Sequence, residues 1–249
     1  MSMQEKNELK KIEKDESVKW EPLGAFLITI AAYIASQIAL VILLVAISHF
    51  KPGQNVQNLL NSSTWLELLL TGLSSATMLG VLWIYLKKRK SSFRNLGFRR
   101  IKWSDLGWLL VGVVGYFVIV SIVLEAASYI PGFNANQTQN VGYQGATGLQ
   151  LVLAFIGLVV LPPIAEEMLF RGFLYRGLAK RLPKILSALI TSGLFALLHF
   201  QWNVSLDVFV LSLVLIALYE KTKNLWVCVG LHAIKNGIAF LALFVFVSR

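Results

Sequence analysis

Residues 23–49 read LGAFLITIAAYIASQIALVILLVAISH, a run without a single Asp, Glu, Lys or Arg. A helix needs about 20 consecutive, mainly apolar residues to cross the hydrocarbon core of a membrane, and this run is long enough. Six further apolar segments follow it: Trp65–Leu86, Leu106–Ile130, Leu149–Ala165, Ile185–Phe200, Val204–Leu218 and Leu225–Val247. The sequence therefore predicts an all-α, polytopic transmembrane helix bundle of about seven spans, of which the fifth and sixth are the least distinct.

The composition supports this class. Of the 249 residues, 56% are hydrophobic and 14% are charged, whereas a soluble domain has about 45–50% apolar and about 25% charged residues. Cys228 is the only cysteine, so a disulfide within the chain is excluded. The formal net charge is +10, but the basic residues lie between apolar spans instead of forming a separate domain. We therefore expect the lipid bilayer, and no nucleic acid, as a partner.

The distribution of charge predicts the orientation. Segments 87–104 and 171–184 are rich in Lys and Arg, whereas segments 51–64 and 131–148 contain only Lys51 between them. Cytoplasmic loops carry an excess of Lys and Arg. Seven crossings place both basic segments on the cytoplasmic side. We expect a multi-pass protein of the cell membrane with its amino terminus in the cytoplasm and its carboxyl terminus outside.

Three parts of the chain differ in character. Residues 1–22 are expected to form a cytoplasmic polar tail, without a cleaved signal peptide. Residues 23–148 are expected to form the amino-terminal transmembrane helices. Residues 149–249 carry the polar residues that are unusual in a membrane span, and we expect them to form the catalytic core.

The sharpest anomaly is a pair of adjacent carboxylates, Glu166 and Glu167, in the apolar segment LPPIAEEMLFRGFLY. Two like charges side by side in an apolar segment disfavour full ionisation. One carboxyl group can then take up or release a proton, as a general base must. Pro162 and Pro163 are expected to loosen the helix just before them and to free backbone carbonyl groups.

Three more polar residues follow inside or near spans, namely His199, His232 and Asn236. Glu166 and His199 each lie roughly 20 Å along a helix from a turn expected at Leu182–Pro183. They should therefore face each other on antiparallel helices. His232 and Asn236 are four residues apart and share a helix face. We expect a polar intramembrane cavity formed by these residues, nearer to the cytoplasmic side.

Simpler explanations exist for single residues. Glu167 and Arg171 are spaced as an ordinary helix ion pair, and His199 alone could be an interfacial histidine. Phe195 is expected to pack. Asp207 is expected to lie at the membrane interface, and Lys235 to extend its ammonium group toward water.

The motifs together resemble a known family. EEMLFR fits Glu-Glu-x-x-x-Arg, FALLH fits Phe-x-x-x-His and HAIKN fits His-x-x-x-Asn, in this order and on separate helices. This set is similar to the CPBP family of intramembrane proteases, also called the Abi family. That family includes CAAX prenyl endopeptidases and proteins of bacteriocin processing or immunity. The resemblance covers about residues 150–240.

The resemblance implies a role for each matching residue. Glu166 would activate a water molecule, helped by His199, while His232 and Asn236 would stabilise the oxyanion. Glu167 and Arg171 would form a pair that holds the geometry. A divalent metal, with Zn²⁺ as a candidate, could instead be held by Glu166, His199 and His232. Because His-Glu-x-x-His is absent from the sequence, we prefer a mechanism without a cofactor, and the metalloprotease alternative stays open.

The implied function is that of an intramembrane endopeptidase, a hydrolase acting on a membrane-associated protein or peptide. The resemblance suggests bacteriocin maturation or self-immunity as the setting. Two other functions are open. The first is a non-catalytic immunity or scaffold protein, against which the complete motif set counts. The second is a proton-coupled transporter, because buried carboxylates also mark ion paths.

Overall fold

The computed structural model describes residues 18–50, 59, 63–134, 137, 142, 143 and 145–246. Within these residues the fold is all-α and contains no strand. Helix α2 covers Pro22–Phe50, α4 Thr64–Lys88, α5 Trp103–Ser128, α9 Lys184–Leu197, α10 Trp202–Thr222 and α11 Leu225–Leu241. A short 3₁₀ turn, η1, covers Phe93–Leu96. The expected fold class is confirmed, and six of the described helices are long and apolar enough to cross a membrane.

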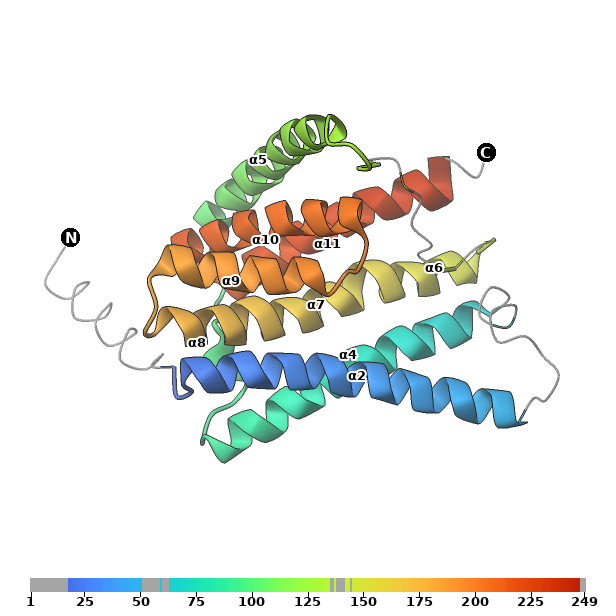
Figure 1. Cartoon of the computed structure of the whole chain (residues 1–249), viewed down its shortest axis with the longest axis horizontal. Helices are drawn as coiled ribbons and strands as arrows, with labels where there is room; N and C mark the ends of the chain where they lie inside the picture. The colour runs from blue at the N-terminus through green and yellow to red at the C-terminus, as the bar shows by residue number, and fades with distance from the viewer. Residues whose placement is uncertain are drawn as a thin grey trace, which may run out of the picture.

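The central helix runs without interruption from Leu149 to Ala179. It consists of α6 (Leu149–Phe155), the π-helical segment η2 (Ile156–Val160), α7 (Leu161–Glu167), the π-helical segment η3 (Met168–Tyr175) and α8 (Arg176–Ala179). Figure 1 shows α2 and α4 on one side of this helix and α9, α10 and α11 on the other. The carboxylate pair therefore lies on the helix at the centre of the bundle.

The fifth expected span is too short to cross a membrane. Helix α9 has 14 residues, which gives it a length of about 21 Å, less than the hydrocarbon core of about 30 Å. Figure 1 shows that the turn from α9 into α10 does not reach as far along the bundle as the amino-terminal end of α6, which is the far end of the central helix. The sixth span is longer than expected, with 21 residues in α10. Helices α9 and α10 thus form a hairpin of unequal arms.

The outer helices expose apolar surface, as helices in contact with lipid do. In the most apolar window of α2 only 11% of the residues are buried, against 44% in α10. Large side chains of α2 such as Val41 and Ile42, and of α5 such as Leu110, are more than half exposed. In water such a surface would promote aggregation. The chain is therefore a multi-pass membrane protein.

The central helix is packed closely against its neighbours. Every residue of η3 is buried. At Gly172 a Cβ atom would lie 2.9 Å from Leu96 Cβ and 3.0 Å from its carbonyl oxygen, so a side chain there would push η1 away. The indole of Trp20 is buried and donates a hydrogen bond of 3.0 Å to the carbonyl oxygen of Phe173. These contacts hold the helix that carries the carboxylates.

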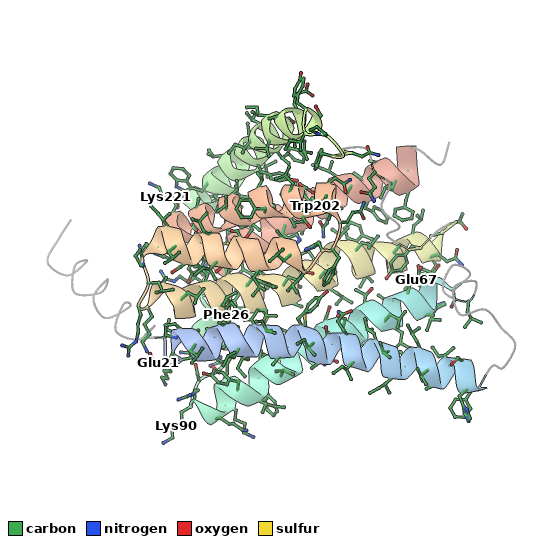
Figure 2. All side chains as sticks on the ribbon, viewed as in Figure 1. Glu21, Phe26, Glu67, Lys90, Trp202 and Lys221 are labelled. Atoms are coloured by element: carbon green, nitrogen blue, oxygen red, sulfur yellow. The ribbon has the colours of Figure 1, made fainter. Side chains whose placement is uncertain are left out.

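The basic segments gather at one end of the bundle. Figure 2 shows Glu21, Lys90 and Lys221 at that end and Glu67 far from it. Lys180 and Arg181 bond to Glu21 at 2.7 and 2.8 Å and hold the pKa of its carboxyl group below the usual value. The arrangement agrees with the expected charge asymmetry. Which side of the membrane this end faces stays a prediction. The division of the chain into residues 1–22, 23–148 and 149–249 also stays a prediction. Residues 1–17 of the expected tail lie outside the described residues.

Candidate active site

The helix turn before the carboxylates has a carbonyl group that the helix cannot satisfy. In an α-helix the carbonyl of Leu158 would accept a hydrogen bond from residue 162, and in a π-helix from residue 163. Both positions are proline and have no N–H. The side-chain amide of Asn236 on α11 donates to this carbonyl at 3.0 Å. The two prolines therefore explain why Asn236 contacts the helix at this point.

Behind the carboxylate pair lies a buried charge network. Glu167 and Arg171 are both fully buried. Glu167 Oε1 accepts hydrogen bonds from Arg171 Nη1 and His232 Nδ1, each at 2.8 Å. Glu167 thus contacts more than its helix ion-pair partner. It also fixes the imidazole of His232, with Nδ1–H toward the carboxylate and Nε2 on the opposite side of the ring.

The guanidinium group of Arg171 is held by an aromatic ring as well. Its Cζ lies 4.6 Å from the ring centroid of Phe195, a distance typical of a cation–π contact. Phe195 also packs edge-on against the rings of His199 and His232, at centroid distances of 5.0 and 6.1 Å. Its role is packing, as expected, and it joins the buried charges to both histidines.

Glu166 and His199 belong to a cavity of about 250 Å³ on the open side of this network. The polar side chains that line the cavity are Glu166, His199, His232, Lys235 and Asn236. Glu166 comes from α7, His199 from the turn after α9, and the other three from α11. Of the six residues singled out in the sequence, four therefore line one cavity, and Glu167 and Arg171 lie buried behind it.

The two histidines present the same ring nitrogen, Nε2, to the cavity. His199 Nδ1 lies 2.8 Å from the carbonyl oxygen of Phe195. Since a carbonyl only accepts hydrogen bonds, Nδ1 carries the proton and Nε2 is the available nitrogen. His232 Nε2 lies 3.8 Å from Glu166 Oε2, beyond direct hydrogen-bond distance. Each histidine is oriented by a bond at Nδ1, and Nε2 is the nitrogen left for chemistry.

The turn that carries His199 is fixed by neighbouring segments. The hydroxyl of Tyr33 on α2 donates to the carbonyl oxygen of Leu198 at 3.0 Å. Phe200, three residues after the end of α9, has a φ of +52° in the left-handed region. His199 is therefore held at the tip of the α9–α10 hairpin, where it lines the cavity together with His232 and Asn236.

Sequence reasoning missed an ion pair beside these residues. Lys235 Nζ and Asp207 Oδ2 are 2.9 Å apart, and their side chains are only 19% and 20% exposed. The hydroxyl of Tyr116 on α5 donates to the other oxygen of Asp207. Lys235 thus pairs with Asp207 instead of extending its ammonium group freely toward water, and the interfacial position expected for Asp207 stays a prediction. Their opposite charges on neighbouring spans were the available signal.

The metal alternative can be tested against the geometry. Among the described residues, no group of three His, Cys, Asp or Glu side chains lies close enough together to hold a metal ion. His232 Nδ1 is bonded to Glu167 and His199 Nδ1 to a carbonyl oxygen. Glu166, His199 and His232 line the same cavity but do not converge on one point as a ligand set. We therefore derive no chemical step through a metal.

Comparisons with known proteins show what this chain is similar to. A curated relative, UPF0177 protein YxdF of Lactococcus lactis subsp. lactis (strain IL1403), is 26% identical over 140 residues, which is 54% of this chain and 72% of the relative. No solved structure matches. Residues 148–238 match the family described as type II CAAX prenyl endopeptidase, Rce1-like. These residues contain the carboxylate pair, both histidines and Asn236, and they form an Rce1-like domain of the type II CAAX prenyl endopeptidase (CPBP/Abi) family.

Proposed function

We propose that this protein is an intramembrane endopeptidase that hydrolyses a peptide bond with a water molecule activated by Glu166. One observation carries the proposal: side chains of the types that peptide hydrolysis requires, from three separate segments, line one cavity inside a bundle of apolar helices. The family of residues 148–238, which implies protease activity, supports it.

The first step would be attack of water on the peptide carbonyl. Glu166 lines the cavity and is 22% exposed, so its carboxylate is open to a water molecule. It would take one proton from that water while the oxygen bonds to the carbonyl carbon. His199, whose Nε2 is the available nitrogen, would assist by accepting or returning a proton. The product is a tetrahedral intermediate with a negatively charged oxygen.

The second requirement is a donor for that oxygen. Asn236 has two amide N–H bonds, one of which is used on the Leu158 carbonyl, so the other is available for the oxyanion. His232 Nε2 would be a second donor when it carries a proton, with Glu167 stabilising the positive charge through Nδ1. The proton held by Glu166 would then pass to the leaving nitrogen as the C–N bond breaks. Glu167 and Arg171 act here as positioning residues.

The proposed substrate is a membrane-associated protein or peptide, because the cavity opens within a membrane bundle. Bacteriocin maturation or self-immunity is the setting that the family resemblance suggests. The competing functions are a non-catalytic immunity or scaffold protein and a proton-coupled transporter.

The test compares peptide termini in membrane and secreted fractions of cells that express the wild type or Glu166→Gln at equal levels. We expect new termini that appear only with the wild type. A Glu166→Gln variant that inserts normally and still yields the same termini would remove Glu166 as the base. Identical termini from wild-type and empty-vector cells would favour a non-catalytic role, and flux that depends on pH would then favour transport.

A further inference from the structure

A second polar cavity lies away from the site, at the basic end of the bundle. It has a volume of about 210 Å³ and is formed by residues 99–108 and 221–224, two segments far apart in the sequence. A water molecule occupies about 30 Å³, so the cavity is larger than a single ordered water needs. Helix α5 begins, α10 ends and α11 begins at this place.

The floor of this cavity is rigid and buried. Asp105 and Asn224 are 6% and 1% exposed. Asn224 Nδ2 donates to Asp105 Oδ2 at 3.0 Å, and the backbone N–H of Lys102 donates to the same oxygen at 3.1 Å. Asn224 Oδ1 accepts from the backbone N–H of Trp226 at 3.2 Å. The two segments are thereby fixed to each other, so the cavity is preformed.

The walls are strongly basic. Four Lys and Arg side chains line the cavity against the single carboxylate of Asp105, namely Arg99, Arg100, Lys102 and Lys221. The ammonium group of Lys221 lies 4.5 Å from the ring centroid of Trp108, which is 38% exposed. A partly exposed tryptophan beside lysine is typical of the membrane–water interface. The cavity thus combines an excess of positive charge with a place at the edge of the apolar spans.

The alternative is that these residues only orient the protein in the membrane. Lys87 and Lys88 at the end of α4 illustrate that case, since both are exposed and neither lines a cavity described at this end. Basic residues that serve orientation alone need no shared concave surface or buried floor. The cavity of residues 99–108 and 221–224 has both.

We propose that this cavity binds the phosphate group of an anionic phospholipid. Free inorganic phosphate offers the same chemistry, but the exposed Trp108 ring and the adjoining apolar helix ends favour a phosphate that is attached to acyl chains. Clusters of basic side chains between transmembrane helices recognise such headgroups. The proposal does not depend on the protease activity.

The test measures binding of phosphatidylglycerol to the purified full-length protein by native mass spectrometry, with phosphatidylcholine, which is zwitterionic and has no net charge, as the reference lipid. The test variant is Arg100→Gln/Lys221→Gln, and the matched control is Lys87→Gln/Lys88→Gln, which removes the same charge at the same end. Each basic residue that faces the bound phosphate is expected to contribute about a factor of five, which Lys87 and Lys88, outside the lining of this cavity, do not contribute. We therefore expect the test variant to bind phosphatidylglycerol roughly 30-fold more weakly than the wild type.

The control variant should lose much less, and the charge-preserving Arg100→Lys/Lys221→Arg should retain binding, which separates the effect from misfolding. Equal loss in the test and control variants would overturn the proposal, because it would show general surface attraction. Competition by millimolar inorganic phosphate that equals competition by phosphatidylglycerol would overturn the assignment to a lipid.

Discussion

Replacing Glu167 by Gln should destabilise the protein far more than replacing Glu166 by Gln, although the two substitutions are chemically identical and adjacent. Glu167 is fully buried and accepts bonds from Arg171 and His232, each at 2.8 Å. Glu166 lies at the edge of the cavity with 22% of its side chain exposed. The difference in the free energy of unfolding between the two variants therefore measures how much the buried charge network stabilises the protein.

The magnitude follows from the burial of Arg171. Its side chain has no exposed surface, and its Nε and Nη2 have no hydrogen-bond partner among the described residues. Glu167→Gln removes the negative charge and leaves the guanidinium group buried beside a neutral amide. Breaking a buried ion pair in this way costs about 3–5 kcal/mol. That is a roughly 100- to 4,000-fold change in the unfolding equilibrium, at about 1.4 kcal/mol per factor of ten.

The assay is reversible unfolding of the purified protein in mixed micelles, followed by tryptophan fluorescence. Glu166→Gln is the matched control and should stay within about 1 kcal/mol of the wild type, as substitutions at partly exposed sites usually do. The double variant Glu167→Gln/Arg171→Met should be more stable than Glu167→Gln alone, because no charge is then left unpaired.

Two results would refute the reasoning. Equal stability of Glu166→Gln and Glu167→Gln would mean that the pair is not buried as described. Additive losses in the double variant would mean that Glu167 and Arg171 do not stabilise each other. Loss of cleavage in Glu166→Gln at normal stability fits a role of Glu166 in the chemistry. Glu167→Gln should instead lose both cleavage activity and stability.

Three further outcomes are expected. Asn236→Ala should lower the rate of cleavage about 10²- to 10³-fold by removing an oxyanion donor. It should also lower the free energy of unfolding by about 1–3 kcal/mol, because the Leu158 carbonyl loses its partner. An unchanged cleavage rate in the purified variant would exclude the donor role. Exhaustive chelation should leave cleavage intact, and restoration of a chelated enzyme by Zn²⁺ would overturn the metal-free mechanism. A reporter fused after Arg249 should lie outside the cytoplasm, and a cytoplasmic signal would contradict the predicted orientation.

The apolar segments predicted most of the fold because a transmembrane helix requires little beyond length and apolar composition. The bounds of α4, expected as Trp65–Leu86 and found as Thr64–Lys88, differ by two residues or fewer. The early end of α9 was harder to predict. Its sequence stays apolar through Leu198, but the helix ends at Leu197. The chain then turns toward α10 with a left-handed backbone at Phe200, a conformation that the sequence does not signal because the residue is not glycine.

The candidate site could be predicted because its residue types are costly in lipid and have recognisable spacing. The partners within the site could not all be predicted. The spacing of four residues predicted the pair of Glu167 and Arg171. The hydrogen bond between Glu167 and His232, however, joins residues that are 65 positions apart. Asn236 was expected only as an oxyanion donor, and its bond to the Leu158 carbonyl depends on how α11 crosses the central helix. Such contacts arise from helix packing, which the spacing of residues along one segment does not determine.

Hydrolysis by this protein itself can be measured with isotopically labelled water. Purified wild-type protein and Glu166→Gln are each incubated with detergent-solubilised membranes from cells that lack the gene, in H₂¹⁸O, and the new peptide termini are analysed by mass spectrometry. We predict that the wild type produces new carboxyl termini that carry one ¹⁸O atom and that Glu166→Gln produces none. Labelled termini that form equally with both proteins, or with neither while the wild type remains folded, would contradict the assignment of the protein as a glutamate-dependent intramembrane endopeptidase.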